Sequence, residues 1–256
     1  MIGPSDFGAA RILGGRALQE DEFAFHFNDQ GRSGDFILLA VVADGMGGVP
    51  GGRQASKVAV TTFVDVFVSM PGSIPDRLEK ALRHANRELA ILGDESPEVK
   101  GMGTTLLAAC FTREGVYWIN VGDSVLWLFR DGILQRLNEE HSYRTVLYEK
   151  VKRGELTVEE ARQSPHKNTL LSALAGGPIA MLEIHNVPMR VKPGDCIVVA
   201  TNGVLTLNHA AVASALNQLL DQKPKQIAAL LLKAVEMKGL PNQDNATALV
   251  VRIRNG

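Results

Sequence analysis

The chain lacks the sequence features that direct a protein into or across a membrane. Its start, MIGPSDFGAARI, contains no apolar core of a signal peptide, and its longest apolar runs fall well below the roughly 20 residues needed to cross a bilayer. We therefore expect a soluble, cytoplasmic protein that has no membrane partner.

A strong net charge of either sign is also lacking. The 27 basic and 28 acidic residues give a formal net charge of -1 at pH 7. The overall balance therefore predicts no nucleic-acid partner, and any phosphate-binding pocket would have to be local.

Cysteine is scarce, and histidine does not cluster. The two cysteines, Cys110 and Cys196, lie in apolar runs without metal-ligand spacing, and we interpret them as reduced core residues. The six histidines stand singly, and we interpret His141 as structural. The sequence thus indicates no thiolate or imidazole metal site.

Linker-like segments and internal repeats are absent as well. The chain has 256 residues, of which 45% are hydrophobic and 21% charged, enough apolar material for a substantial core. We expect a single domain over residues 1–256.

What the chain does contain is an apolar run that ends in one carboxylate and a group of glycines. Residues 36–48 read FILLAVVADGMGG, which predicts a strand buried on both faces with Asp44 at its end. A carboxylate in that position must meet a cation or hydrogen-bond donors. A turn in which Asp44 caps a helix is an equally good interpretation of this stretch alone.

Further acids stand at the ends of other predicted strands. Glu20 and Asp21 come just before the alternating Phe23, Phe25 and Phe27, although a solvated charge cluster before an edge strand would look the same. Asp123 and Asp244 each adjoin an apolar strand, where an ordinary turn is the alternative. Asn202 follows the strand at 195–200.

Carboxylates that repel one another converge only where cations hold them. Oxygen ligands without His or Cys select hard ions such as Mg²⁺ or Mn²⁺. Two such ions, bridged by an acid and by water, would lower the pKa of that water and clamp a phosphoryl group, while a nearby Arg binds the phosphate oxygens. Arg16 is the candidate for that role.

The remaining elements are mostly helices and short strands. Residues 75–92 predict an amphipathic helix, whereas residues 54–70 fit a helix or a strand because they are rich in β-branched residues. Short strands at 103–111, 116–121, 125–130 and 134–137 predict an antiparallel meander with a hairpin turn at 130–132. Residues 141–163 predict a polar helical excursion, and helices at 209–220 and 224–238 precede a last strand at 247–253.

In these motifs the sequence resembles the metal-dependent protein serine/threonine phosphatases of the 2C type, bacterial branch, over nearly its whole length. The matching motifs are R-x-x-x-E-D at 16–21, ADGMGG at 43–48, GTT at 103–105, VGDS at 121–124, HS at 141–142 and DN at 244–245. Each motif alone is weak, but all of them occur in order.

The resemblance implies an α+β fold in four layers, α-β-β-α: a central antiparallel β-sandwich flanked by helix pairs. It implies two Mg²⁺ or Mn²⁺ ions and hydrolysis of phosphoserine or phosphothreonine in a protein by a metal-bridging water or hydroxide. The protein substrate is expected to be the target of a cognate serine/threonine kinase. It implies a mobile flap at about 142–166 and settles residues 54–70 as helix. The implied metal-site residues are Glu20, Asp21, Asp44, Gly45, Asp123, Asn202 and Asp244, with Arg16 on the phosphate and Asp44 bridging the ions.

Two departures from the family pattern motivate an alternative. Asn202 and Thr206 stand where the family places Asp, so one metal site is expected to be weakened and a third metal is not expected. The alternative is a degenerate phosphatase fold that binds or regulates without turnover.

A nucleotide-binding enzyme is a second alternative. Residues 47–54, GGVPGGRQ, follow a strand as a phosphate-binding loop does, but Arg53 and Gln54 replace the Lys and the hydroxyl residue that such a loop needs. We rank it well below the phosphatase.

Overall fold

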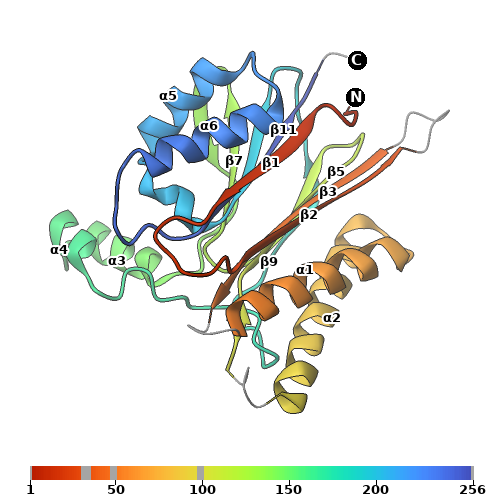
Figure 1. Cartoon of the computed structure of the whole chain (residues 1–256), viewed down its shortest axis with the longest axis horizontal. Helices are drawn as coiled ribbons and strands as arrows, with labels where there is room; N and C mark the ends of the chain where they lie inside the picture. Colours follow the sequence, from red (N-terminus) through yellow and green to blue (C-terminus); the bar gives the residue numbers. More distant parts are fainter. Residues whose placement is uncertain (1, 30–35, 47–50, 97–100, 255–256) are drawn as a thin grey trace.

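Two antiparallel sheets pack face to face at the centre of the fold, and a helix pair covers each outer face (Figure 1). The computed structural model describes residues 2–29, 36–46, 51–96 and 101–254. The four-layer α+β architecture predicted from the sequence is confirmed.

The first sheet has five strands in the order β1-β11-β10-β7-β8. They are β1 (Phe7–Ile12), β11 (Ala246–Arg252), β10 (Cys196–Ala200), β7 (Val125–Arg130) and β8 (Ile133–Arg136). The second sheet runs β2-β3-β5-β6-β9, with a short β4 paired to β3. Its strands are β2 (Asp21–Asp29), β3 (Phe36–Met46), β4 (Gly103–Thr104), β5 (Leu106–Phe111), β6 (Val116–Val121) and β9 (Glu183–Met189).

Helices α1 (Gly51–Ser69) and α2 (Ile74–Glu95) cover the second sheet, and α5 (His209–Leu219) and α6 (Pro224–Glu236) cover the first. Burial decides the ambiguous segment: α1 turns Ala55, Ala59, Phe63 and Phe67 inward at helical spacing. Packing of this apolar stripe outweighs the β propensity of its branched residues.

The predicted amphipathic helix α2 is confirmed and is well capped. The Ser73 hydroxyl accepts a hydrogen bond from the Asp76 N–H, and proline occupies the first turn, where its missing N–H is no loss. The face that α2 buries consists of Leu78, Ala81, Leu82, Ala85 and Leu89.

The hydrophobic residues form three clusters that follow the four layers. One lies between α1, α2 and the second sheet, one between α5, α6 and the first sheet, and one between the two sheets. Cys110 and Cys196 are fully buried in the outer two clusters, as predicted. Burial raises the pKa of each thiol to about 12.

The meander contains the predicted hairpin, in which Asp131 and Gly132 both have positive φ, at 51° and 79°. That geometry suits the two-residue turn between twisted strands. The predicted strand at 103–111 is divided into β4 and β5 at Thr105, where the Asp44 N–H donates to the Thr105 side-chain hydroxyl and not to a backbone carbonyl of the ladder. Strands β1 and β9 carry no clear alternation and were not predicted.

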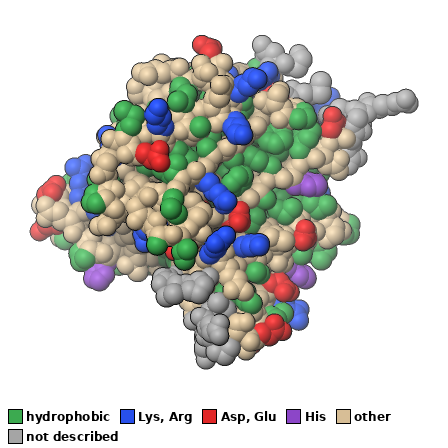
Figure 2. Space-filling model, in the orientation of Figure 1, with side chains coloured by type: hydrophobic (Ala, Val, Ile, Leu, Met, Phe, Trp, Pro, Cys, Tyr) green, Lys and Arg blue, Asp and Glu red, His purple; other side chains and the backbone are tan. Residues whose placement is uncertain are grey.

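The polar excursion forms α3 (Tyr143–Lys152) and α4 (Val158–Gln163), which project from one end of the molecule (Figure 1). Its outer edge carries acidic and basic side chains together (Figure 2). A capping box between Thr157 and Glu160 starts α4. We call residues 142–166 the flap.

None of the helices in the described ranges is both long and apolar enough to span a membrane.

Candidate active site

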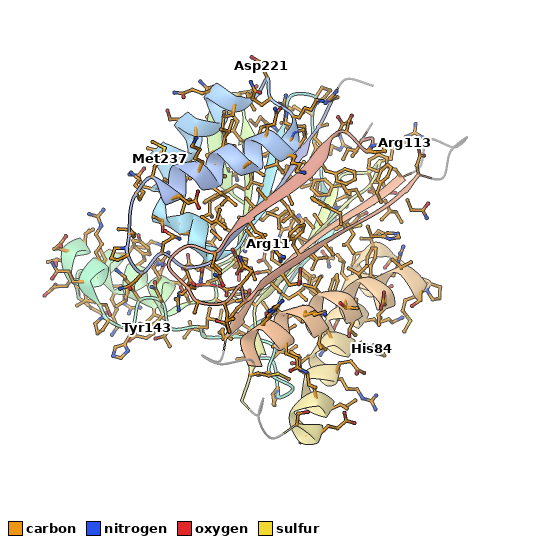
Figure 3. All side chains as sticks on the ribbon, viewed as in Figure 1. Arg11, His84, Arg113, Tyr143, Asp221 and Met237 are labelled. Atoms are coloured by element: carbon orange, nitrogen blue, oxygen red, sulfur yellow. The ribbon has the colours of Figure 1, made fainter. Side chains whose placement is uncertain are left out.

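A cleft of about 700 Å³ opens at the end of the sandwich beside the flap. Figure 3 shows Met237, just after α6, and Tyr143, at the start of α3, at this same end. The cleft is lined by the loop before β2, the end of β3, the loop before β11 and the short helix η3 (Asn202–Thr206). Its lining residues include Arg16, Glu20, Asp44, Gly45, Asn202 and Asp244. We call it the carboxylate cleft.

Strand pairing brings two of the predicted acids together. Asp21 of β2 lies directly opposite Asp44 of β3 in the antiparallel register, and opposite residues of such a pair project to the same face. The prediction that Asp44 ends its strand is wrong by two residues, since β3 continues to Met46 because Gly45 and Met46 pair with β4.

The backbone of Asp44 is fixed from both sides. Its N–H donates to the Thr105 hydroxyl at 3.0 Å, and its carbonyl accepts from the Thr105 N–H at 2.9 Å and the Thr104 hydroxyl at 3.0 Å. The side chain of Asp44 is thus presented to the cleft by a rigid main chain. The predicted GTT motif supplies these contacts.

Glu20 is held where the start of α1 meets β3. Its N–H donates to Asn245 Oδ1 at 2.8 Å, and its carbonyl accepts from the Gly45 N–H at 3.1 Å. A Cβ at Gly52 would collide with Glu20 Oε1, so only glycine lets the helix start approach this carboxylate. Gly47 and Gly48 lie outside the described residues.

Asp21 is buried between the two sheets. Its Oδ2 accepts hydrogen bonds from the hydroxyls of Thr201 and Thr247, at 2.8 and 2.7 Å. Thr201 follows β10 and Thr247 lies in β11, so both hydroxyls come from the opposite sheet. Burial raises the pKa of Asp21 to about 7, although the two hydroxyls act in the other direction. Neither threonine was predicted as a site residue, because a hydroxyl in or just after a strand carries no distinctive spacing.

Asp123 and Asn202 form a direct contact. Asn202 Nδ2 donates to Asp123 Oδ2 at 3.0 Å. Burial raises the pKa of Asp123, and the amide hydrogen bond lowers it. Thr206, the other departure from the family pattern, donates its hydroxyl to Gln243 Oε1 at 2.7 Å.

Arg16 and Asp244 meet at the mouth of the cleft. Arg16 Nε lies 3.0 Å from Asp244 Oδ1, and about half of the Arg16 side chain is exposed. The exposed guanidinium retains donors for an incoming anion. His141, by contrast, is buried and accepts the Gly122 N–H on Nδ1 at 3.2 Å, so its structural role is confirmed.

The predicted carboxylates act on one another electrostatically. Burial raises the pKa of Asp44 well above its usual value, and four neighbouring acids raise it further: Asp21, Asp123, Asp244 and Glu20. The structure therefore brings five acids from four separate segments to one end of the sandwich. Like charges this close need a compensating cation or protons.

Uncompensated oxygen atoms show that a cation fits here. Glu20 Oε1, Asp21 Oδ1 and Asp123 Oδ1 are buried without a hydrogen-bond donor. Within the described ranges, no three acidic, His or Cys side chains group tightly enough to hold an ion by themselves. A hard ion would therefore take few carboxylates and complete its shell with a backbone carbonyl and water, which is how Mg²⁺ commonly binds.

The fold and this cleft agree with one known family. The model of the protein phosphatase 2C family matches residues 8–236. The chain belongs to that family and is a protein phosphatase, a hydrolase of phosphoproteins. The resemblance seen in the sequence motifs is confirmed.

Similar proteins come from several bacteria. Serine/threonine phosphatase stp of Listeria monocytogenes serotype 4b (strain F2365) is 29% identical over 221 residues, 83% of this chain and 83% of that protein. The S. agalactiae serine/threonine phosphatase superposes with a TM-score of 0.81 at 28% identity, over 97% of this chain and 99% of that one. The catalytic domain of the phosphatase PstP, crystallised with two manganese ions, superposes with a TM-score of 0.77 at 24% identity. This match covers 97% of this chain and 98% of that one.

Proposed function

We propose that this chain removes phosphate from phosphoserine or phosphothreonine in proteins and needs two divalent cations, Mg²⁺ or Mn²⁺, to do so. The observation that carries the proposal is a set of buried carboxylate oxygens without donors around a cleft that also presents an exposed arginine. Glu20 lines the cleft itself, whereas Asp21 and Asp123 do not line it but act electrostatically on Asp44, which does. The PstP structure supports the metal requirement, because a protein of the same fold holds two manganese ions.

We assign three roles to the residues in and beside the carboxylate cleft. Asp44 and the Gly45 carbonyl would hold the cations together with Glu20 and Asp244, and Asp21 would orient water on the buried side. Arg16 would bind the phosphoryl oxygens, which requires its guanidinium to turn from Asp244. When bound, the cations lower the pKa of a water and offset the charge of the phosphoryl group.

The substrate is expected to be a protein phosphorylated by a serine/threonine kinase. The Listeria relative is named a serine/threonine phosphatase, which supports this substrate class. The cleft is open at the surface and adjoins the flap, so a phosphorylated side chain on a larger chain can reach it.

One observation favours a second function, binding without turnover. The Asn202 amide already donates to one oxygen of Asp123, Oδ2, and this neutral side chain contributes no charge to a cation. A fold with one weakened metal site would still bind phosphoprotein.

Hydrolysis of a phosphothreonine peptide distinguishes the two functions. The chain as it stands should release phosphate only when Mn²⁺ or Mg²⁺ is supplied in excess, and Asp44→Asn should release none. Leu240→Ala, at the exposed rim of the cleft, is the control for a change that leaves the ligands in place. Peptide binding without phosphate release at any metal concentration would establish the second function instead.

A further inference from the structure

A second cavity lies beside the carboxylate cleft, beneath the flap. It has a volume of about 380 Å³ and lies between α3, α4 and η3. Three residues line both cavities: Arg144, Lys167 and Leu205. A substrate with one group in the cleft can therefore place a neighbouring group in this second cavity, which we call the flap pocket.

The lining of the flap pocket has one sign of charge. Arg144, Arg162 and Lys167 are cationic, and none of the described residues that line the pocket is acidic. The outer edge of the flap differs, because both signs occur there (Figure 2). The rest of the lining is Leu147, Tyr148, Ala161 and Leu205, of which Leu147 and Ala161 are buried.

The cations of the pocket are only weakly neutralised within the chain. Arg144 Nε is 3.6 Å from Glu140 Oε1, but Glu140 is engaged more closely by Arg136, at 2.6 Å. Lys167 Nζ donates to the Arg162 backbone carbonyl at 2.9 Å, and it pairs with no carboxylate in the part of the chain that the structure describes.

Arg162 is the pocket's free guanidinium. The described ion pairs within α3, α4 and their connection use other residues, Lys152 with Glu149 and Arg153 with Glu155. Arg162 is exposed and has no carboxylate partner among the described residues. A guanidinium binds carboxylate and phosphate oxygens in pairs, and an apolar floor strengthens such bonds by excluding water.

We propose that the flap pocket binds an acidic group that flanks the phosphorylated residue on the same protein substrate, and so selects acidic phosphorylation sites. This group is a carboxylate or a second phosphoryl group, since both present paired anionic oxygens. The proposal rests on the proposed function, because it requires a phosphorylated side chain in the carboxylate cleft.

Binding of non-hydrolysable peptides tests the selection. Three fluorescent peptides would carry the same phosphonate analogue of phosphothreonine, flanked on both sides by Glu, by a second phosphonate residue or by Gln, and anisotropy would give each Kd with Mn²⁺ present. The chain should bind the first two about 10-fold more tightly than the Gln peptide, which corresponds to about 1.4 kcal/mol. A gain for the second peptide alone would assign the pocket to phosphate.

Two arginine variants provide the matched comparison. Arg162→Gln should reduce the preference for acidic peptides to about 2-fold or less. Arg153→Gln removes an arginine of the flap that is paired with Glu155 outside the pocket, and it should keep the preference. Equal binding of all three peptides, or equal loss in both variants, would overturn the proposal.

Hydrolysis of p-nitrophenyl phosphate by the unmodified chain separates the two proposals. This ester carries no acidic group besides its phosphate, so its turnover does not depend on acidic selection by the flap pocket. Turnover without acidic selectivity would refute the flap pocket and keep the phosphatase, whereas acidic selectivity without turnover at any Mn²⁺ concentration would refute the proposed hydrolysis and keep the pocket.

Discussion

Asn202→Asp changes a neutral amide into a carboxylate beside the buried Asp123. The amide hydrogen bond at 3.0 Å is lost, and a hydrogen bond to a charged group contributes about 1.5–3 kcal/mol. Two charges at that separation repel by on the order of 5 kcal/mol at an effective dielectric constant of about 20. One of the two acids can avoid this repulsion by retaining a proton, which costs about 4 kcal/mol or less at pH 7. That cost limits the penalty, so we expect the metal-free variant to lose about 2–4 kcal/mol of stability.

Thermal unfolding followed by circular dichroism measures this loss. For a chain of this size each kcal/mol corresponds to roughly 2–4 °C, so in EDTA the variant should melt roughly 4–16 °C lower. Excess Mn²⁺ should raise the Tm of the variant more than that of the unmodified chain, because the added carboxylate repels only while no cation is present.

Asn208→Asp is the matched control, because Asn208 caps α5 through its side-chain oxygen and an aspartate caps equally well. It should leave the Tm in EDTA almost unchanged. An Asn202→Asp variant that melts together with this control in EDTA would refute the reasoning, since the amide would then stabilise nothing at Asp123.

Three further predictions follow from burial and close packing. The pKa of Asp21 is about 7 in the folded chain against a usual 3.8, so the folded state binds a proton that the unfolded state has lost, and metal-free stability should fall as the pH rises from about 4 to about 7. Urea unfolding in EDTA at a series of pH values should show this fall, and Asp21→Asn should make it shallower. A stability that rises with pH over this range would contradict the prediction. Gly52→Ala should displace the Glu20 carboxylate and raise the Mn²⁺ concentration for half-maximal phosphatase activity about 10-fold. Gly93→Ala is the control, because open space surrounds Gly93, and it should leave that concentration unchanged. The same Mn²⁺ dependence in both variants would contradict the proposed role of Glu20. Neither cysteine should react with a thiol reagent in the folded chain, because burial raises both thiol pKa values to about 12, and labelling without denaturant would contradict the buried placement.

Most of the helices and strands could be predicted because they carry strong periodic patterns, whereas their four-layer arrangement was implied by the family resemblance. Helix α2 shows its apolar stripe, and β3 shows a continuous apolar run that two packed layers require. The segment that became α1 was ambiguous from its own residues. Its conformation depends on Phe63 and Phe67 packing against a sheet built from distant strands, which local propensity does not encode.

The candidate site could be predicted as a set of acids but not as a geometry. The acids were identified by their positions at the ends of predicted strands, and the family resemblance implied a role for each of them. The donors that position them could not be found, because the Thr201 and Thr247 hydroxyls reach Asp21 from the other sheet. The Asn202 contact with Asp123 was likewise hidden, since their spacing along the chain has no periodic meaning.

The anchoring of Asp21 across the two sheets also bears on how the protein unfolds. Its two hydroxyl contacts join residues 180 and 226 positions apart in the chain, and such distant contacts form only after the two sheets have docked. A cation bound near Asp21 would therefore stabilise the native state much more than the transition state for folding. The cation should therefore slow unfolding and leave the folding rate almost unchanged, so that it increases the kinetic stability of the folded sandwich.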